Sequence, residues 1–336
     1  MHPHPSSSVP PVSRRLLSAA QRWLDVVGPF LGLLLVLGLL ALSEEARPFI
    51  FTGANFKVVL TQTVIVAIGA LGMSLVIVSG GIDLSVGSVV AFTSVLGARL
   101  LVADVPPVLA VAAVVAAGGV IGLVNGAIIA GLRMLPFIVT LGMMGVIRGA
   151  AKWLSNKQTV SAPENSPVNA IMARVHPNDF LPLPLGVWVA VALVAVMAVV
   201  MNRTIFGRHA FAIGSNEATA RLCGIRVRWT KLGIYGLAGL FFGTAGLMQL
   251  SRLTQGDPSV AVGLELDIIA AVVIGGASLS GGTGSVLGAM IGALIMAVLR
   301  NGTNQLGWET YVQEILIGVV IVLAVGVDRF RHARPR

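Results

Sequence analysis

The sequence predicts an all-α, polytopic membrane protein, a bundle of about ten transmembrane helices of which some are interrupted. Its 336 residues are 56% hydrophobic and only 11% charged, whereas charged residues approach a quarter of an ordinary soluble domain. Apolar runs about as long as a bilayer crossing recur along the chain. The 40 glycines include dense passages that would break helices. These features exclude an ordinary soluble domain.

The apolar runs place the expected spans in order along the chain. They lie near residues 26–43, 58–79, 84–102, 108–129, 135–153, 185–202, 232–250, 264–279, 285–299 and 311–327. The runs at 264–279 and 285–299 are short for independent spans, so the break at 280–285 is interpreted either as a bend inside the protein or as a true loop. The proline-containing segment 154–184 is expected either to pack across the outer mouth or to form a plain surface loop.

Basic residues predict the orientation of the spans, because short cytoplasmic segments are enriched in Lys and Arg. They collect in three places that alternate spans put on one side: the Pro/Ser-rich tail at 1–22, the polar segment at 203–231 and the tail at 329–336. Both termini are therefore expected in the cytoplasm, with a disordered first tail, a transmembrane domain over 23–328 and a basic last tail. The net charge of +9 then reflects topology, and no nucleic-acid partner is expected.

The basic segment 203–231 is the longest interruption between spans that suits the cytoplasm. Asn216 is expected to cap a short helix through its side-chain oxygen, and Glu217 lies favourably in the first turn. Gly224 can adopt the left-handed conformation that closes the other end. The helix over 217–223 would be about 10 Å long. A short capped helix at the edge of a membrane bundle is typical of a docking element.

Two glycine-rich passages resemble each other, one around Asp83 and one around Ser280. Each would follow a span that runs toward the cytoplasm, and this pairing suggests an internal repeat whose interrupted helices meet near a pathway. The alternative is tight packing between helices, which small residues also serve and which explains most of the glycines on its own. The expected helix breaks are Gly80, Gly81, Gly275, Gly276, Gly281 and Gly282.

Several polar residues are candidates for a pathway or a gate, and each also has a structural interpretation. Asp83 is an ionisable side chain near the inner boundary of the membrane, where such groups are functional candidates. It also directly precedes a helix start, and there we favour a capping role. Glu265 and Asp267 open a span from the outside, where they suit the helix dipole or a gate; two residues apart, they make a poor metal or acid–base pair. Polar groups within spans could bind a hydroxyl-rich solute or a neighbouring helix. The candidates are Asp83, Ser85, Asn125, Thr140, Glu265 and Asp267.

The sequence lacks the motifs of several functional classes. It contains no G-x-x-x-x-G-K-[ST] phosphate loop and no H-E-x-x-H, its five histidines are scattered, and Cys223 is the only cysteine. No catalytic set is therefore predicted, and no metal or cofactor is expected on this chain. No span carries the paired charges of a proton relay, which disfavours an ion-driven carrier. Energy is expected to come from another chain.

Four passages resemble the membrane permease subunits of bacterial ABC importers for sugars of the ribose, xylose and galactose type, also called carbohydrate uptake family 2. They are SGGIDLSVGSVVAF, LPFIVTLGMMGVIRG, AIGSNEATARLCGI and GLELDIIAAVVIGGASLSGGTGS, at 79–92, 135–149, 212–225 and 263–285. Two positions depart from the family pattern: Cys223 replaces a serine, and Leu264 stands where tyrosine is common. The resemblance implies that 203–231 is a cytoplasmic coupling loop, with Gly214, Asn216, Glu217, Ala218, Ala220, Arg221 and Gly224 as its ATPase-coupling residues.

The resemblance also implies the partners and the activity. An ABC ATPase subunit would carry ATP and Mg²⁺, a periplasmic or lipid-anchored protein would bind the sugar, and a second permease subunit, expected to be a copy of this chain, would complete the pathway. The expected function is import of a monosaccharide through the bacterial cytoplasmic (inner) membrane, within membrane lipid and without enzymatic activity on this chain. The alternatives are a permease for a branched-chain amino acid or a nucleoside, an ion-coupled carrier and a non-transporting scaffold.

Overall fold

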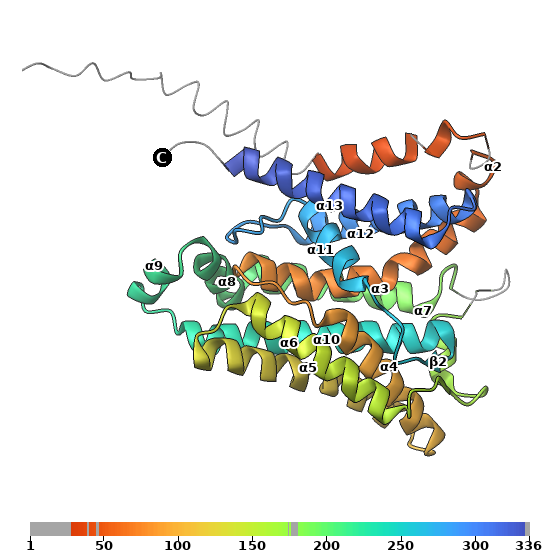
Figure 1. The fold of residues 1–336 in the computed structure, drawn as a ribbon, viewed down its shortest axis with the longest axis horizontal. Coiled ribbons are helices and arrows are strands. Elements are labelled where there is room, and N and C mark those ends of the chain that lie inside the picture. The colour runs from red at the N-terminus through yellow and green to blue at the C-terminus, as the bar shows by residue number, and fades with distance from the viewer. Residues whose placement is uncertain (1–27, 39, 45–46, 174, 176–180, 333–336) are drawn as a thin grey trace, which may run out of the picture.

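The computed structural model describes residues 28–38, 40–44, 47–173, 175 and 181–332, so the predicted tail at 1–22 lies outside the described residues. Helices dominate, and they lie along a common direction (Figure 1). Residues Gly28–Gly38 form a short apolar helix. The further elements are α2 (Arg47–Ile50), α3 (Gly53–Val78), α4 (Val86–Val102), α5 (Pro107–Leu132), α6 (Pro136–Leu154), β1 (Val160–Ser161), η1 (Pro167–Ile171), α7 (Leu185–Arg203), α8 (Ile205–Ser215), α9 (Glu217–Leu222), α10 (Val227–Leu253), β2 (Gln255–Gly256), α11 (Leu264–Ile274), α12 (Val286–Gln305) and α13 (Thr310–His332).

The all-α, polytopic fold class predicted from the sequence is confirmed. Each of the ten apolar runs contains a helix in the part of the chain that the structure describes. Six of those described helices are long and apolar enough to cross a bilayer: α3, α5, α6, α7, α10 and α12. Helix α11 has only 11 residues, about 16 Å of helix against a hydrocarbon core of about 30 Å. It is therefore one of the interrupted helices.

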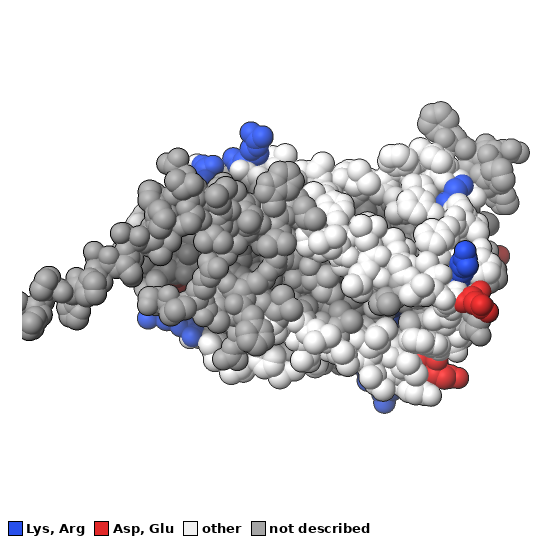
Figure 2. All heavy atoms as spheres, turned by 90° about the horizontal axis from the view of Figure 1, so that it is seen from above, with Lys and Arg blue, Asp and Glu red and all other residues white. Residues whose placement is uncertain are grey.

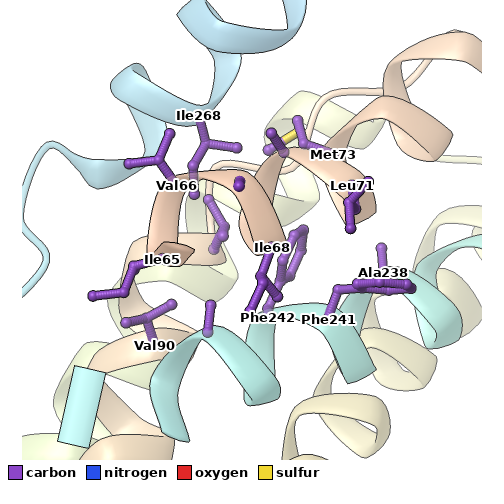
Figure 3. Close-up of a cluster of buried hydrophobic side chains, with 14 of the residues drawn as sticks. Ile65, Val66, Ile68, Leu71, Met73, Val90, Ala238, Phe241, Phe242 and Ile268 are labelled. Atoms are coloured by element: carbon purple, nitrogen blue, oxygen red, sulfur yellow. The ribbon is translucent and has the colours of Figure 1, made fainter. Parts of the chain in front are cut away.

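Helix α3 is the centre of the bundle. Of its most apolar stretch 89% is buried inside the protein, against 28% for α5 and 22% for α6, so α3 faces other helices while α5 and α6 present apolar side chains outward. Side chains of α3 pack there against side chains of α4, α10 and α11 (Figure 3). The cluster includes Ile65, Val66, Ile68, Leu71, Met73, Val90, Ala238, Phe241, Phe242 and Ile268. A movement of α3 would therefore displace side chains on most of the helices in the bundle.

Helices α5 and α10 pack through small residues. A Cβ placed on Gly118 would lie 2.6 Å from the Cα of Gly243, and one on Gly122 would lie 3.0 Å from the Cα of Gly239. Real Cβ contacts are not that short, so only glycine allows the two backbones to approach this closely. For these four glycines, the structure supports tight packing between helices.

The segment between α6 and α7 packs against the end of α10. Strands β1 and β2 pair antiparallel, with Val160 opposite Gly256, and the hydroxyl of Ser251 accepts a hydrogen bond of 2.9 Å from the Met172 amide. Val168 and Met172 are buried. This segment is therefore not a plain surface loop. It closes the end of the bundle that lies opposite α8 and α9 (Figure 1).

Charged side chains gather at the two ends of the molecule (Figure 2). The described atoms on the face shown there include blue groups toward both ends and red groups at the end away from α9, and most of the other described atoms are white. Helix α13 ends at the same end as α8 and α9 (Figure 1), and it includes 329–332, the first part of the predicted basic tail. The remaining residues, 333–336, lie outside the described part of the chain.

Candidate functional site

Helix α9 forms as the sequence predicts. The side-chain oxygen of Asn216 accepts a hydrogen bond of 2.9 Å from the Thr219 amide, and Gly224 has a φ of 83°. The Gly224 amide donates to the Arg221 carbonyl at 3.0 Å and the Ile225 amide to the Ala220 carbonyl at 3.1 Å, which is the pattern that ends a helix on a left-handed glycine. Local residues on both sides of α9 therefore define its length.

Glu217 fastens α9 to α10. Its carboxylate bonds to Arg221 at 2.5 Å within α9 and to Lys231 at 2.7 Å on α10. Burial opposes ionisation of this carboxyl, but the hydrogen bonds and charges of Lys231 and Arg221 outweigh burial and lower the pKa of Glu217. Glu217 is therefore ionised at neutral pH, and its two bonds weaken only as the pH falls through that lowered pKa.

The rest of α9 divides between an inner and an outer face. Ala220 is buried and packs with Ile213 of α8 and Val227 of α10. Ala218 is exposed, and Leu222 is 89% exposed. Ala220 thus attaches α9 to the bundle, whereas Ala218 and Leu222 are free to meet a partner. Leu222 was not singled out from the sequence.

The structure corrects the expected form of the segment 203–231. Only one short helix was expected there, but α8 precedes α9 and α10 begins at Val227, so Lys231 lies within a long helix. The carbonyl of Val200 accepts a hydrogen bond of 2.6 Å from the Thr204 hydroxyl, which in turn accepts one of 3.1 Å from the Gly207 amide. Thr204 is thus the N-cap of α8. The segment is a compact helical element rather than a loop.

Both predicted helix breaks are confirmed. Helix α3 ends at Val78 and α11 ends at Ile274. Positive φ angles of 77° to 90° occur at Gly80, Gly276, Gly281 and Gly282, where other residues are strained. Gly81 and Gly275 serve close approach instead: a Cβ on Gly81 would clash with the Tyr235 hydroxyl, and one on Gly275 would lie 2.6 Å from the amide of Ala289 in α12.

The two breaks meet each other at the end of α8. The Gly282 amide donates a hydrogen bond of 2.8 Å to the Val78 carbonyl, which joins the second break to the end of α3. A Cβ on Gly281 would lie 2.9 Å from the Cα of Gly80, and one on Gly214 would lie 2.7 Å from the Gly282 nitrogen and would clash with the Val78 carbonyl oxygen. The last turn of α8 therefore touches both breaks, two residues before α9 begins.

Four of the six candidate polar residues surround the first break. The Asp83 carboxylate accepts hydrogen bonds from the Ser85 amide at 2.8 Å and the Ser85 hydroxyl at 2.6 Å. The Asn125 amide donates to the Ser85 hydroxyl at 3.0 Å, and the Thr140 hydroxyl accepts from the Leu84 amide at 3.1 Å. All four candidates are at most 1% exposed. They hold the break against α5 and α6.

The hydrogen bonds of Asp83 differ from those of a helix N-cap. Helix α4 begins at Val86, and the carboxylate binds the amide of Ser85, the residue before it, rather than an amide of the first turn. The ion pairs formed within the described part of the chain do not include Asp83. Its role is to fix the turn that precedes α4.

We expect Asp83→Asn to keep transport within about threefold of the wild type, because an amide oxygen can still accept the two hydrogen bonds from Ser85. The Asn125 side-chain oxygen has no hydrogen-bond partner among the described residues, so a flipped Asn125 could accept from the new amide. Asp83→Ala, which removes the acceptor, is the comparison. Uptake assays in vesicles check this. Loss of uptake in Asp83→Asn, with normal expression and unfolding temperature, would show that the charge itself is required.

The other two candidates, Glu265 and Asp267, lie in the first turn of α11. The Glu265 carboxylate reaches the first turn of α4, because a Cβ on Gly87 would clash with its Oε2. Asp267 pairs with Arg300 of α12 at 2.5 Å. Glu265 accepts a hydrogen bond of 3.3 Å from the Gly263 amide. The guanidinium of Arg148 on α6 donates to the Val260 carbonyl at 2.6 Å. The two carboxylates have different partners, as their spacing in the sequence indicates. Arg300, the basic partner of Asp267, could not be identified from the sequence.

The candidate residues thus form two groups. The Asp83 group lies beside the first break, and Glu265 and Asp267 lie at the start of α11, where Glu265 reaches the first turn of α4. No group of three or more His, Cys, Asp or Glu side chains that could hold a metal ion occurs among the described residues.

The sequence family described as the branched-chain amino acid transport system permease component matches residues 55–325. The ribose import permease RbsC of Escherichia coli K12 is 41% identical over 298 residues, which cover 88% of this chain and 92% of the relative. The chain belongs to the family of sugar ABC importer permeases. The L-arabinose permease AraH of Azospirillum brasilense is 36% identical over 86% of this chain and 84% of the relative. The fructose permease FrcC of Rhizobium meliloti is 34% identical over 89% of this chain and 84% of the relative.

The match covers the whole helical bundle from α3 into α13 and includes both breaks, α8 and α9. No solved structure matches the chain significantly. The permease is therefore a multi-pass inner-membrane protein, as its apolar helices also indicate.

Proposed function

We propose that this permease is the transmembrane subunit of an ATP-driven importer that moves a monosaccharide, a pentose or a hexose, from a binding protein into the cytoplasm. The observation that carries the proposal is the contact of α8 with both helix breaks. The Gly282 amide bonds to the Val78 carbonyl at 2.8 Å, and Gly214 fits against both residues. A force on α9 therefore reaches, through the last turn of α8, the end of α3 and the second break at Gly281 and Gly282.

Helix α9 is the proposed docking site of the ATPase subunit. Its exposed Ala218, Arg221 and Leu222 face outward, while Ala220 and the two bonds of Glu217 attach it to α8 and α10. A firmly attached helix with an apolar tip suits rigid-body transfer of motion. The partner supplies the energy of ATP hydrolysis. The end with α8 and α9 is then cytoplasmic, which agrees with the distribution of basic residues.

The remaining partners follow from the same assignment. The binding protein would dock at the opposite end, formed by β1, β2 and the segment between α6 and α7. A second copy of the chain would complete the pathway, and α5 and α6, whose most apolar stretches are 28% and 22% buried, are available for it or for lipid. When the breaks move with α9, the central position of α3 passes the motion to the rest of the bundle.

The relatives favour sugars over other solutes, since they are named as ribose, L-arabinose and fructose permeases. The description of the matching family, however, refers to branched-chain amino acids. That description keeps a branched-chain amino acid permease as the second candidate.

The test is reconstitution of the permease in proteoliposomes with the ATPase subunit and the binding protein of the same importer. We expect ATP-dependent uptake of at least one of D-ribose, L-arabinose and D-fructose, unchanged when ionophores collapse the ion gradients. Uptake of leucine in place of the sugars would support the second candidate. Uptake that follows an ion gradient without ATP would contradict both.

A further inference from the structure

A polar cavity of about 290 Å³ is lined by residues of α3, α10, α11 and α12 and of the segment that precedes α11. Its size is close to the lower limit of small-molecule sites, about 300–1,000 Å³. Six polar side chains line it: Gln62, Gln249, Arg252, Asp267, Arg300 and Asn304. Asp267 is among the candidates named from the sequence.

The polar lining lies near one end of the spans. Gln62 follows the start of its apolar run at 58 by four residues, about 6 Å along the helix. Gln249 lies in α10, four residues before its end at Leu253. Polar side chains inside a membrane bundle are costly to leave unpaired, and they commonly mark a solute pathway.

Three polar atoms of these side chains have no hydrogen-bond partner among the described residues: the Oε1 of Gln62, the Oδ1 of Asp267 and the Nε of Arg300. Asp267 is 2% exposed. Its bond to Arg300 uses Oδ2 and one terminal nitrogen, so one acceptor and one donor remain side by side. A hydroxyl both donates and accepts. One hydroxyl, or two on neighbouring carbons, could therefore satisfy both atoms after small side-chain rotations.

Apolar side chains complete the lining, among them Ile65, Val66 and Met296. A monosaccharide has the matching character, with C–H groups on its faces and hydroxyls around its edge. A metal cation fits poorly, because the lining holds two guanidinium groups, Arg252 and Arg300, and only one carboxylate, Asp267. A free amino acid would have to draw Asp267 away from Arg300 to bind its ammonium group.

We propose that this cavity is a binding site for the monosaccharide on its way through the permease, with Gln62, Gln249 and the Asp267–Arg300 pair as hydrogen-bonding residues. The proposal rests on the proposed function and adds a second point of selection after the binding protein. Specificity is then shared: the pocket of the permease favours sugars whose hydroxyls reach the unpaired atoms.

The test compares Gln62→Leu and Gln249→Leu, which keep most of the volume but remove the hydrogen bonds, with Asn202→Leu. Asn202 is an exposed amide near the end of α7 and does not line the cavity. Each variant is reconstituted with the same ATPase and binding protein. Initial rates are measured for D-ribose, L-arabinose, D-fructose and ATP hydrolysis.

We expect at least one cavity variant to lose about fivefold in uptake of the preferred sugar, the effect of one lost hydrogen bond, with ATP hydrolysis retained. The ratio of rates between sugars should also change, because the binding protein is the same in every sample. Wild-type rates and ratios in both variants overturn the site, and so does an equal loss for every sugar together with ATP hydrolysis. A wild-type permease that takes up no sugar overturns the proposed function instead.

Discussion

Gly214→Ala is expected to lower ATP-driven sugar uptake about tenfold or more. The added Cβ would clash with the Val78 carbonyl oxygen and lie 2.7 Å from the Gly282 nitrogen, between the two groups of the hydrogen bond that joins the breaks. Overpacking of this kind costs about 1–3 kcal/mol, and each 1.4 kcal/mol is about tenfold. The surface of α9 is unchanged, so ATP hydrolysis should continue while sugar uptake fails.

The matched control is Gly149→Ala in α6, where an added Cβ meets no atom within 4 Å. Uptake and ATP hydrolysis are measured on the same proteoliposomes, and thermal unfolding in detergent shows whether the bundle is intact. Normal uptake by Gly214→Ala would mean that α8 does not need to touch the breaks, and the proposed route from α9 to α3 would be wrong.

Gly224→Val should weaken attachment of the ATPase subunit and reduce uptake about 5- to 30-fold. Gly224 has a φ of 83°, and a Cβ there meets no atom within 4 Å, so the effect comes from the backbone alone. A left-handed conformation costs a residue with a side chain roughly 1–2 kcal/mol, which corresponds to that range. Because α9 has only six residues, it cannot absorb the change elsewhere.

Gly224→Asn is the control, since asparagine tolerates the left-handed region. Co-purification of the ATPase subunit and uptake are the measurements. If Gly224→Val folds, retains the ATPase subunit, stimulates ATP hydrolysis and transports as the wild type does, α9 is not the docking element.

Features that depend on a few neighbouring residues could be predicted from the sequence. The cap at Asn216, the left-handed Gly224 and the helix ends at Val78 and Ile274 all follow from local backbone chemistry. The spans could likewise be predicted, because the thickness of the bilayer sets how long an apolar helix must be to cross it. Helix α8 was missed because its sequence is too polar for a span and too short for a clear pattern.

Features that join distant parts of the chain required the fold. The Asp267–Arg300 pair connects α11 to α12, and Gln62 becomes part of a cavity only when α3 packs beside them. Residues on different helices have no fixed spacing in the sequence, so no pattern could reveal these neighbours.

Local chemistry alone thus established a membrane bundle with two glycine breaks and one short capped helix at 217–222. Only the packing of the helices placed the end of α8 against both breaks. Glycine permits a break wherever it occurs, but whether two breaks touch depends on how the intervening helices pack, which is a property of the whole bundle.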